Sequence, residues 1–283
     1  MSKTISSRRG RRLGPRDASE ISTFANAVRF LYDRVDFERM RVVRYDDSTF
    51  KLDRMRDLLD GLGNPHEQIR TVHVAGTLGK GSTVAMIGSM LRGCGYGVGQ
   101  FTSPHLVDVR ERITINNGRI TKSEFTDLMR LASTAAEKLT SEPTFFELFT
   151  AIAFKHFADQ AVDIAIIEVG LGGRLDSTNV ITPEVAAITR IDYDHTHILG
   201  RSLSAIAREK AGIFKRGVPA LSLQQTPEVE AVLREEAEKV ECPLRFLNKD
   251  IEFSSRFGVS ESLGPHTRVC VGTETSQFMH LPV

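Results

Sequence analysis

A glycine-rich loop between a strand and a helix constrains the fold of this chain more than any other sequence feature. The stretch TVHVAG (71–76) is short and β-branched, which is typical of a buried strand. STVAMIGSMLRGCGY (82–96) places Val84 and Ile87 on one helical face, and GVGQFTS (97–103) indicates a second strand. A strand, a helix and another strand with short connections form a βαβ unit. The pattern therefore predicts parallel strands with a right-handed crossover.

The same alternation continues along the chain. Helices are expected in the segment 21–63 and at 123–139, 144–160, 202–214 and 226–240, and apolar strands at 162–169, 184–191 and 218–223. Ser123 is a candidate N-cap for its helix. Repeated strand–helix alternation predicts an α/β fold with a mostly parallel, doubly wound sheet. From about residue 244 the pattern predicts only short, weak strands and turns.

Composition narrows the class of protein. The length of 283 residues suits one large domain or two small ones, and the net charge of +1 gives no general attraction to nucleic acid or acidic membrane. No apolar run reaches the ~18 residues of a membrane span. The three cysteines form no C-x-x-C pair, which fits a reducing cytoplasm. Residues 1–20 are arginine-rich without apolar periodicity, and we expect a basic, disordered tail there.

The glycine loop carries the groups that bind phosphate. Backbone N–H groups at a helix N-terminus, with the helix dipole, favour anions, and glycine lets the backbone approach closely. A lysine adds positive charge, and a hydroxyl can bind phosphate or Mg²⁺. The candidate residues are Gly76, Gly79, Lys80, Gly81, Ser82 and Thr83.

The spacing departs from the standard phosphate-loop pattern G-x-x-x-x-G-K-[ST]. The residue six positions before Lys80 is Val74, and Gly81 separates the lysine from Ser82. An ordinary glycine-rich turn with a solvated lysine is the alternative. The strand before the loop and the helix after it favour phosphate binding.

The variant G-T-x-G-K-G-S resembles the loop of the Mur ligase superfamily, and specifically of the folylpolyglutamate synthase/dihydrofolate synthase family. Other stretches resemble that family in the family's order: QFTSPHL, RERITINNGRI, TFFE, IIEVGLGGRLDSTN, DHTHILG and IAREKAGIFKRGVPA. The resemblance covers about residues 24 to 220. It implies a Mur ligase-like ATP-binding domain over 21–283, with 244–283 as its incomplete, short-stranded end. It also implies that the family's C-terminal glutamate ligase domain is absent from this chain.

The resemblance also implies a metal site. Glu168 ends an apolar strand, where a buried carboxylate is costly unless it has a cationic partner. The resemblance makes Glu168, Ser103 and His195 ligands of Mg²⁺, and Lys210 a carbamylated lysine. From the residues alone these are a salt-bridged glutamate, a turn serine, a loop histidine and a solvated helix lysine. His197 is expected in a loop.

A second group of residues is expected to contact the pteridine-bearing substrate. In the family this role belongs to the segment TFFE and to part of the GLGGRLDSTN stretch. The residues that match are Thr144, Phe145, Phe146, Glu147, Leu175, Asp176 and Ser177. Aromatic faces suit stacking on a flat heterocycle. Thr144 and Glu147 are also spaced as a helix capping box.

The chemistry implied by the resemblance is ATP-dependent amide ligation. A carboxylate of folate or dihydropteroate attacks the γ-phosphate of ATP, and the amino group of L-glutamate attacks the acyl phosphate that results. Lys80, Glu168, His195 and Lys210 are then the catalytic candidates, and Thr77 joins the nucleotide loop. The cofactors would be ATP and Mg²⁺. We expect a cytoplasmic monomer that contacts neither nucleic acid nor membrane.

Two departures from the family pattern matter. Leu78 replaces an asparagine or other polar residue, which predicts altered nucleotide handling. Family members are also substantially longer, so an inactive nucleotide- or folate-binding remnant is the main alternative. A ligase of peptidoglycan precursors and a generic phosphate-loop NTPase fit the motifs less well.

Overall fold

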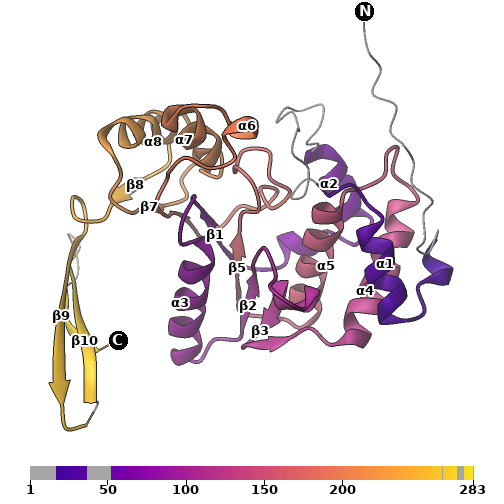
Figure 1. The fold of residues 1–283 in the computed structure, drawn as a ribbon, viewed down its shortest axis with the longest axis horizontal. Coiled ribbons are helices and arrows are strands. Elements are labelled where there is room, and N and C mark those ends of the chain that lie inside the picture. The colour runs from indigo at the N-terminus through magenta and orange to yellow at the C-terminus, as the bar shows by residue number, and fades with distance from the viewer. Residues whose placement is uncertain (1–16, 37–51, 263, 273–276, 283) are drawn as a thin grey trace, which may run out of the picture.

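The computed structural model describes residues 17–36, 52–262, 264–272 and 277–282 (Figure 1). Residues 1–16 of the expected basic tail lie outside the described residues. Its last part forms the 3₁₀ helix η1 (Ala18–Glu20), where Asp17 accepts a hydrogen bond from the N–H of Ser19. Residues 37–51, in the middle of the first expected helical segment, also lie outside the described part.

A sheet of eight strands forms the centre of the molecule, in the order β4-β3-β2-β5-β1-β6-β7-β8. The strands from β2 to β8 in this order are parallel, and β3 and β4 add an antiparallel edge. Their bounds are β1 Thr71–Ala75, β2 Val98–Phe101, β3 Ile113–Ile115, β4 Gly118–Arg119, β5 Ile164–Glu168, β6 Val185–Ile188, β7 Ala220–Ser222 and β8 Leu244–Phe246. The prediction of a mostly parallel α/β sheet is confirmed.

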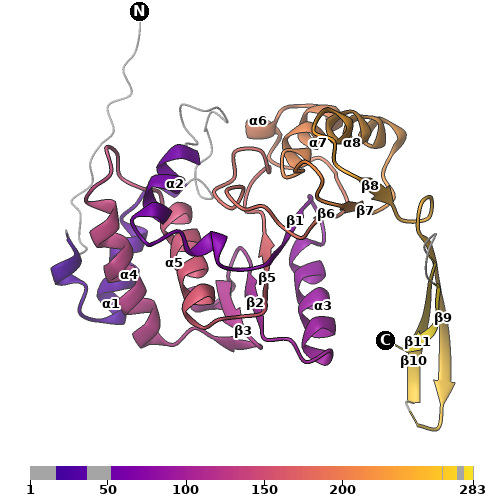
Figure 2. The same cartoon turned by 180° about the vertical axis from the view of Figure 1, so that it is seen from behind.

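Helices cover both faces of this sheet (Figures 1 and 2). Helix α3 packs on one face through Val84, against Val72 of β1 and Ile166 of β5. Helix α5 packs on the opposite face beside β2 and β5, and α7 and α8 continue that layer over β6 to β8. The bounds are α1 Phe24–Tyr32, α2 Leu52–Asp60, η3 Pro65–Glu67, α3 Lys80–Gly93, η4 Val109–Arg112, α4 Lys122–Ala136, α5 Phe145–Asp159, α6 Thr196–Leu199, α7 Leu203–Ala211 and α8 Pro227–Lys239. The sheet is therefore doubly wound, as predicted.

The N-terminus of α4 corrects one expectation. Thr121, and not Ser123, is its N-cap. The Thr121 hydroxyl accepts from the N–H of Glu124, and the Glu124 carboxylate accepts from the N–H of Thr121. This reciprocal capping box satisfies two backbone donors that the helix leaves unpaired, whereas Ser123 lies inside the first turn.

The edge hairpin of β3 and β4 was not predicted as such. Asn116 and Asn117 both have left-handed backbone conformations, with φ of 49° and 67°, and Gly118 follows them. Two consecutive residues with positive φ suit a tight hairpin turn that matches the strand twist. The sequence Asn-Gly is the local signal for it.

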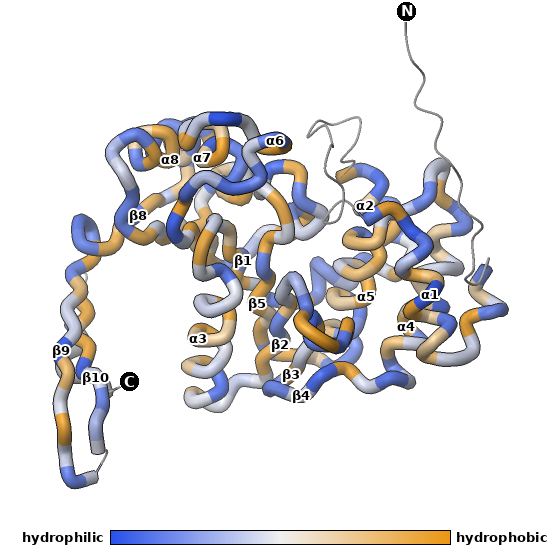
Figure 3. The backbone as a smooth tube through the Cα atoms, in the orientation of Figure 1, coloured by the Kyte–Doolittle hydropathy of each residue, from blue (hydrophilic) through white to orange (hydrophobic). Residues whose placement is uncertain are grey.

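Residues after β8 form a second, antiparallel sheet in the order β11-β10-β9. Strands β9 (Glu252–Ser260) and β10 (Gly264–Gly272) are nine residues each, and β11 is Gln277–Pro282. The expectation of short, weak strands was therefore wrong, and the hairpin extends away from the main body (Figure 1). Apolar segments alternate with polar ones along it (Figure 3). Phe257 and Val259 are exposed on β9.

Within the described residues, every helix is too short or too polar to cross a membrane.

Candidate nucleotide and ligase site

The carboxyl ends of neighbouring parallel strands bring the predicted site residues to one edge of the sheet. The glycine loop follows β1, Ser103 follows β2, Glu168 ends β5, and His195 follows β6. These four strands are adjacent in the order β2-β5-β1-β6. Ligands bind at this edge in open parallel sheets.

Hydrogen bonds to the segment after β6 shape the glycine loop. The N–H groups of Thr77 and Leu78 both donate to the carbonyl of Arg190, at 2.8 and 3.1 Å. The Thr77 hydroxyl donates to the carbonyl of Asp192 at 3.0 Å and accepts from its N–H at 3.1 Å. Thr77 therefore holds the loop in place, and the N–H of Leu78 is engaged within the protein. The side chain of Leu78 is 55% exposed.

Glycine is required at the start of this loop for steric reasons. A Cβ atom on Gly76 would lie 1.8 Å from Oγ1 of Thr189, and the φ of Gly76 is +149°. Gly79 has a φ of +86° and caps helix α3 without crowding. Gly81 faces Glu168, because a Cβ there would lie 3.5 Å from Oε2 of that residue. The start of α3, with Lys80, thus lies beside Glu168, while Ser82 is exposed and Thr83 half-buried.

Glu168 is a buried acid with few hydrogen-bond donors. It is 3% exposed, and among the described residues its hydrogen-bond donor is the N–H of Ser103, at 3.2 Å from Oε2. Burial raises the pKa of Glu168 to about 6, although the positive charges of Lys80 and Arg112 oppose the rise. A buried carboxylate with so few donors has free lone pairs and is stabilised by a positive partner.

The donor set suits Mg²⁺ bound together with phosphate. Within the described residues, no three His, Cys, Asp or Glu side chains form a ready-made metal cage. Mg²⁺ is usually held by one or two carboxylates, with substrate phosphates and waters completing its shell. Glu168 and the adjacent Ser103 hydroxyl fit that pattern.

His195 lies close enough to Lys210 and Lys80 for their charges to affect it. It caps α6 with a left-handed backbone, φ 48°, and its Nε2 is 3.6 Å from Oδ2 of Asp194. Partial burial lowers its pKa, and so do the charges of Lys210 and Lys80. The imidazole therefore favours the neutral form, which can ligate a metal. His197, expected in a loop, lies in α6.

Lys210 is buried beneath the glycine loop. Its Nζ donates to the carbonyl of Gly76 at 2.7 Å, and the side chain is almost fully buried. Burial, together with the charge of Lys80, lowers the pKa of Lys210 to about 7. A lysine that sequence alone would leave solvated and charged is thus only partly protonated at physiological pH.

The loop after β5, residues 170–179, folds around the carboxylate of Asp176. Oδ2 of Asp176 accepts from the N–H of Leu171 at 2.8 Å, and Oδ1 accepts from the N–H of Thr178 at 3.0 Å and from its hydroxyl. Burial raises the pKa of Asp176 to about 6. Asp176 and Leu175 are both buried, so of the predicted substrate residues in this loop only Ser177 is partly exposed.

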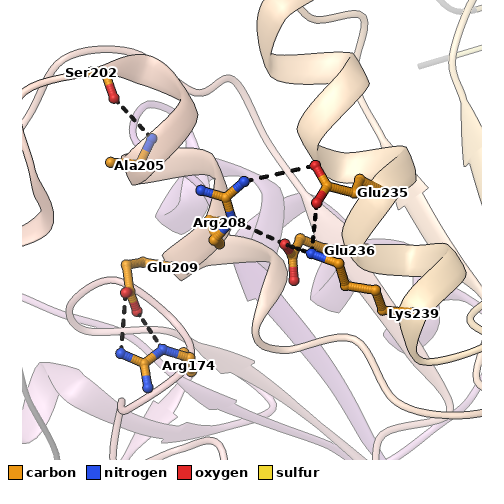
Figure 4. A network of polar contacts seen from close by, with 8 residues as sticks. All are labelled: Arg174, Ser202, Ala205, Arg208, Glu209, Glu235, Glu236 and Lys239. Carbon is orange, nitrogen blue, oxygen red and sulfur yellow. Dashed lines mark hydrogen bonds and ion pairs between the residues drawn. The ribbon is translucent and has the colours of Figure 1, made fainter.

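The same loop is fastened to the end of α7. The N–H of Arg174 donates to the carbonyl of Glu209 at 2.7 Å, and the two side chains form an ion pair (Figure 4). A Cβ on Gly173 would lie 2.6 Å from that carbonyl. Arg208 in turn pairs with Glu236 of α8. The position of this loop therefore depends on the position of α7, the helix that carries Lys210.

The TFFE segment is mostly internal. Thr144 and Glu147 form the capping box of α5, and Glu147 also pairs with Arg54 of α2 at 2.9 Å. Phe145 is buried against Tyr32. Phe146 is partly exposed, and a Cβ on Gly170 would lie 2.5 Å from its ring. Phe146 is thus the member of this segment that borders the site.

Sequence reasoning missed a buried arginine next to the site. Arg112 is 2% exposed, donates to Nδ1 of His105 at 2.9 Å, and lies over the rings of Phe145 and Phe149. Its charge lowers the pKa of Glu168. The stretch RERITINNGRI contained it, but an arginine in that pattern gives no sign that it is buried.

His73, in the centre of β1, was also missed. Its Nε2 lies 2.8 Å from Oγ1 of Thr178. The available signal was a single histidine in an otherwise apolar strand.

The fold and the loop at the end of β1 define an α/β domain of the Mur ligase type, and residues 74–252 match the family model described as the Mur ligase middle domain. The chain belongs to the folylpolyglutamate synthase/dihydrofolate synthase family. It is 47% identical over 202 residues to a dihydrofolate synthase/folylpolyglutamate synthase of Bacillus subtilis, which covers 70% of this chain and 47% of that protein. The mitochondrial folylpolyglutamate synthase of Homo sapiens is 43% identical over 184 residues, which is 63% of this chain and 31% of that protein.

Solved structures agree with this assignment. A structure described as an FPGS–AMPPCP–folate complex superposes with a TM-score of 0.80 at 32% identity, over 92% of this chain and 62% of its own. The folylpolyglutamate synthetase of Lactobacillus casei superposes with a TM-score of 0.76 at 30% identity, over 92% of this chain and 61% of its own. The chain thus spans half or less of the length of the two curated relatives described above.

Proposed function

We propose that this domain performs the phosphoryl-transfer half of an ATP-dependent ligation of L-glutamate to folate or dihydropteroate. The observation that carries the proposal is the position of buried Glu168 beside the start of α3 and Lys80. A phosphate loop and a buried, sparingly hydrogen-bonded carboxylate form a site for a nucleotide with its cation. The solved complex with AMPPCP and folate supports this choice of ligands.

The reaction proceeds in two balanced steps. A carboxylate oxygen of the pteroyl substrate attacks the γ-phosphorus of ATP, so that an O–P bond forms and ADP leaves. The amino group of glutamate then attacks the activated carbonyl, phosphate leaves, and the nitrogen loses a proton. Lys80 and free N–H groups of the loop stabilise the negative charge that moves during transfer.

Glu168, Ser103 and His195 would hold Mg²⁺, which when bound neutralises phosphate charge. Lys210, whose pKa of about 7 leaves part of the amine unprotonated at physiological pH, is suited to react with CO₂. The carbamate would place negative charge under Gly76, to which its Nζ already donates. The nucleotide itself would contact Gly76, Gly79, Gly81, Ser82 and Thr83, with Thr77 shaping the loop.

The pteridine-bearing substrate would lie against Phe146, which borders the site, and against Ser177, which is partly exposed. Thr144, Phe145, Glu147, Leu175 and Asp176 would act from beneath, because they are buried and hold these two in place. We propose a monomer in a reducing compartment, in keeping with the three free cysteines among the described residues.

Calorimetric titration with MgATP tests the nucleotide site. We expect binding by the full chain and a loss of roughly tenfold or more in affinity for Lys80→Ala, because one charged contact to phosphate is removed. Lys138→Ala, at an exposed position after α4, is the matched control and should bind as the unaltered chain does. Equal affinity in all three would contradict the phosphate site.

An assay for ADP and for glutamylated product tests the reaction. ADP release that requires dihydropteroate or tetrahydrofolate supports the acyl-phosphate route. Nucleotide binding without any turnover would contradict the ligase proposal and leave a binding remnant.

A further inference from the structure

A chain of buried polar groups runs from the centre of the sheet to the loop after β5. His73 and Thr178 are both fully buried, and Nε2 of His73 lies 2.8 Å from Oγ1 of Thr178. The Thr178 hydroxyl continues to Asp176, and the Asp176 carboxylate accepts from the N–H of Leu171. Neither His73 nor Thr178 belongs to the nucleotide and metal groups described above.

The direction of each hydrogen bond follows from the acceptor at the end. An ionised carboxylate only accepts, so the Thr178 hydroxyl must donate to Asp176. Its oxygen can then accept from His73, which places the ring proton on Nε2. Nδ1 of His73 has no partner among the described residues, as a bare acceptor nitrogen can tolerate. Burial lowers the pKa of His73 to about 3, so the ring is neutral at physiological pH.

The position of His73 links two parts of the site. His73 lies on β1, three residues before Gly76. It is in register with Ile167 on β5, which directly precedes Glu168. Leu171, whose N–H the chain reaches, lies three residues after Glu168. This series of hydrogen bonds therefore connects β1, which precedes the nucleotide loop, to the backbone at Leu171, which follows Glu168.

We propose that His73 is a positioning residue for the acceptor substrate. It fixes the Thr178 hydroxyl, and this hydroxyl orients the Asp176 carboxylate. The carboxylate in turn holds loop 170–179 and places Ser177 at the site. The inference rests on the proposed function for its effect on catalysis. The hydrogen bonds themselves can be tested without it.

The alternative is a histidine that only fills space in the core. A leucine of similar volume would then serve as well, apart from a general loss of stability. The positioning role requires a donor at the place of Nε2, so a glutamine, whose amide can donate there, should retain it and a leucine should not.

Hydrogen exchange on the full-length chain provides the first test. In His73→Leu we expect the amides of Leu171 and Thr178, both donors to Asp176, to exchange roughly tenfold faster, while amides of β5 keep their protection. His73→Gln should restore slow exchange. Thr71→Val is the matched control, since Thr71 is buried on the same face of β1 and its hydroxyl has no partner among the described residues. Uniformly faster exchange, or no rescue by glutamine, overturns the proposal.

Steady-state kinetics provide the second test. We expect His73→Leu and Thr178→Val each to raise the KM for the pteroyl acceptor roughly tenfold, with the KM for ATP nearly unchanged. The double variant should be no worse than either single one, because both remove the same connection. Additive effects, or equal losses for both substrates, overturn the positioning role. If the unaltered chain shows no ADP release that depends on the acceptor, the proposed function fails while the exchange result still decides the inference.

The ring itself provides a third test. ¹⁵N spectra of histidine-labelled chain should contain a signal that is absent from His73→Gln, and this imidazole should be neutral and protonated on Nε2 from pH 7 to 8. A charged ring, or a proton on Nδ1, overturns the assignment.

Discussion

At the scale of single residues, the site is built from groups that are poorly suited to the interior in the absence of a ligand. Glu168 is an acid with one described donor, and Lys210 is a base whose charge is opposed by both burial and Lys80. Such arrangements lower the stability of the free protein and leave interactions available for a bound ligand. This is the signature expected of a binding site, and it differs from that of a core ion pair.

Replacing Glu168 by glutamine should stabilise the free chain at neutral pH. The folded-state pKa of Glu168, about 6, lies above its ordinary value of 4.5, so the folded chain binds more protons than the unfolded chain between these values. Stability is therefore lost as pH rises through this window. Urea unfolding should show Glu168→Gln more stable by about 1–2 kcal/mol above pH 6.5, with little difference below pH 4.5. An unchanged or lower stability at pH 7.5 would contradict the origin assigned to the shift.

Part of the site could be predicted from the sequence. Lys80 and Glu168 sit where local pattern places them, one at a helix start and the other at a strand end, and sheet topology brings both to one edge. The contact between Lys210 and Gly76 joins residues far apart in sequence, and no local spacing encodes it. The burial of Phe145 likewise depends on α1 packing against α5, and that of Asp176 on the folding of loop 170–179 around its carboxylate. Motif resemblance could point to these residues but could not show that they are buried.

At the scale of elements, a buried ion pair fixes α2 against α5. Arg54 donates to Glu147, whose carboxylate also accepts from the N–H of Thr144 at 2.7 Å. Two helices and the start of the TFFE segment are thus held by one carboxylate. Phe146, next to Glu147, depends on this geometry for its place at the site.

Removing the arginine should be far more damaging than removing its neighbour on the same helix. Arg54→Met leaves Glu147 buried without its cation, and we expect a loss of about 3 kcal/mol in the free energy of unfolding. Arg56→Met breaks only the exposed pair with Asp53 and should cost about 0–1 kcal/mol. Chemical denaturation of both variants measures the difference. Similar losses for the two would mean that the Arg54 pair contributes no more than a surface contact.

The elements themselves were mostly predictable because burial on both faces leaves a simple pattern. IAIIE and VAAI, the runs that form β5 and β6, are uninterrupted apolar segments apart from the terminal Glu168. The hairpin at Asn116 and Asn117 was missed because its strands are only three and two residues long, too short for any periodicity. The long strands β9 and β10 were missed because glycine and serine interrupt the alternation of polar and apolar residues in β9, and glycine is uncommon in strands.

At the scale of the whole molecule, two sheets of different kinds share one chain. Strands β9, β10 and β11 pair with one another, and none of the described strands of the main sheet pairs with them. Their ladder is local and antiparallel, whereas the main sheet joins segments from across the sequence. We therefore expect the two parts to contribute separately to stability.

Deleting residues 252–283 tests that separation. The unfolding free energy of the main sheet should change by less than about 1 kcal/mol, since the deletion removes no strand of its ladder. Circular dichroism in urea, with light scattering to confirm the same assembly state, provides the measurement. Phe257→Ser in the full chain is the companion variant, because Phe257 is exposed and its loss should leave stability unchanged. A much larger loss on deletion would show that the hairpin supports the main sheet.

The order of strands in the main sheet also determines how long a newly synthesised β1 waits for its partner strand. Strand β1, which leads into the nucleotide loop, pairs with β5 and β6, and the first of these begins about 90 residues later. At ~5–20 residues per second, a ribosome needs on the order of 5–20 s to supply that neighbour. During this interval β1, a strand that is buried along its whole length in the folded protein, has no partner in its own sheet. Slower protein synthesis at low temperature lengthens this interval. We therefore expect the yield of soluble chain to depend on whether another molecule or another part of the chain covers β1 until β5 has been synthesised.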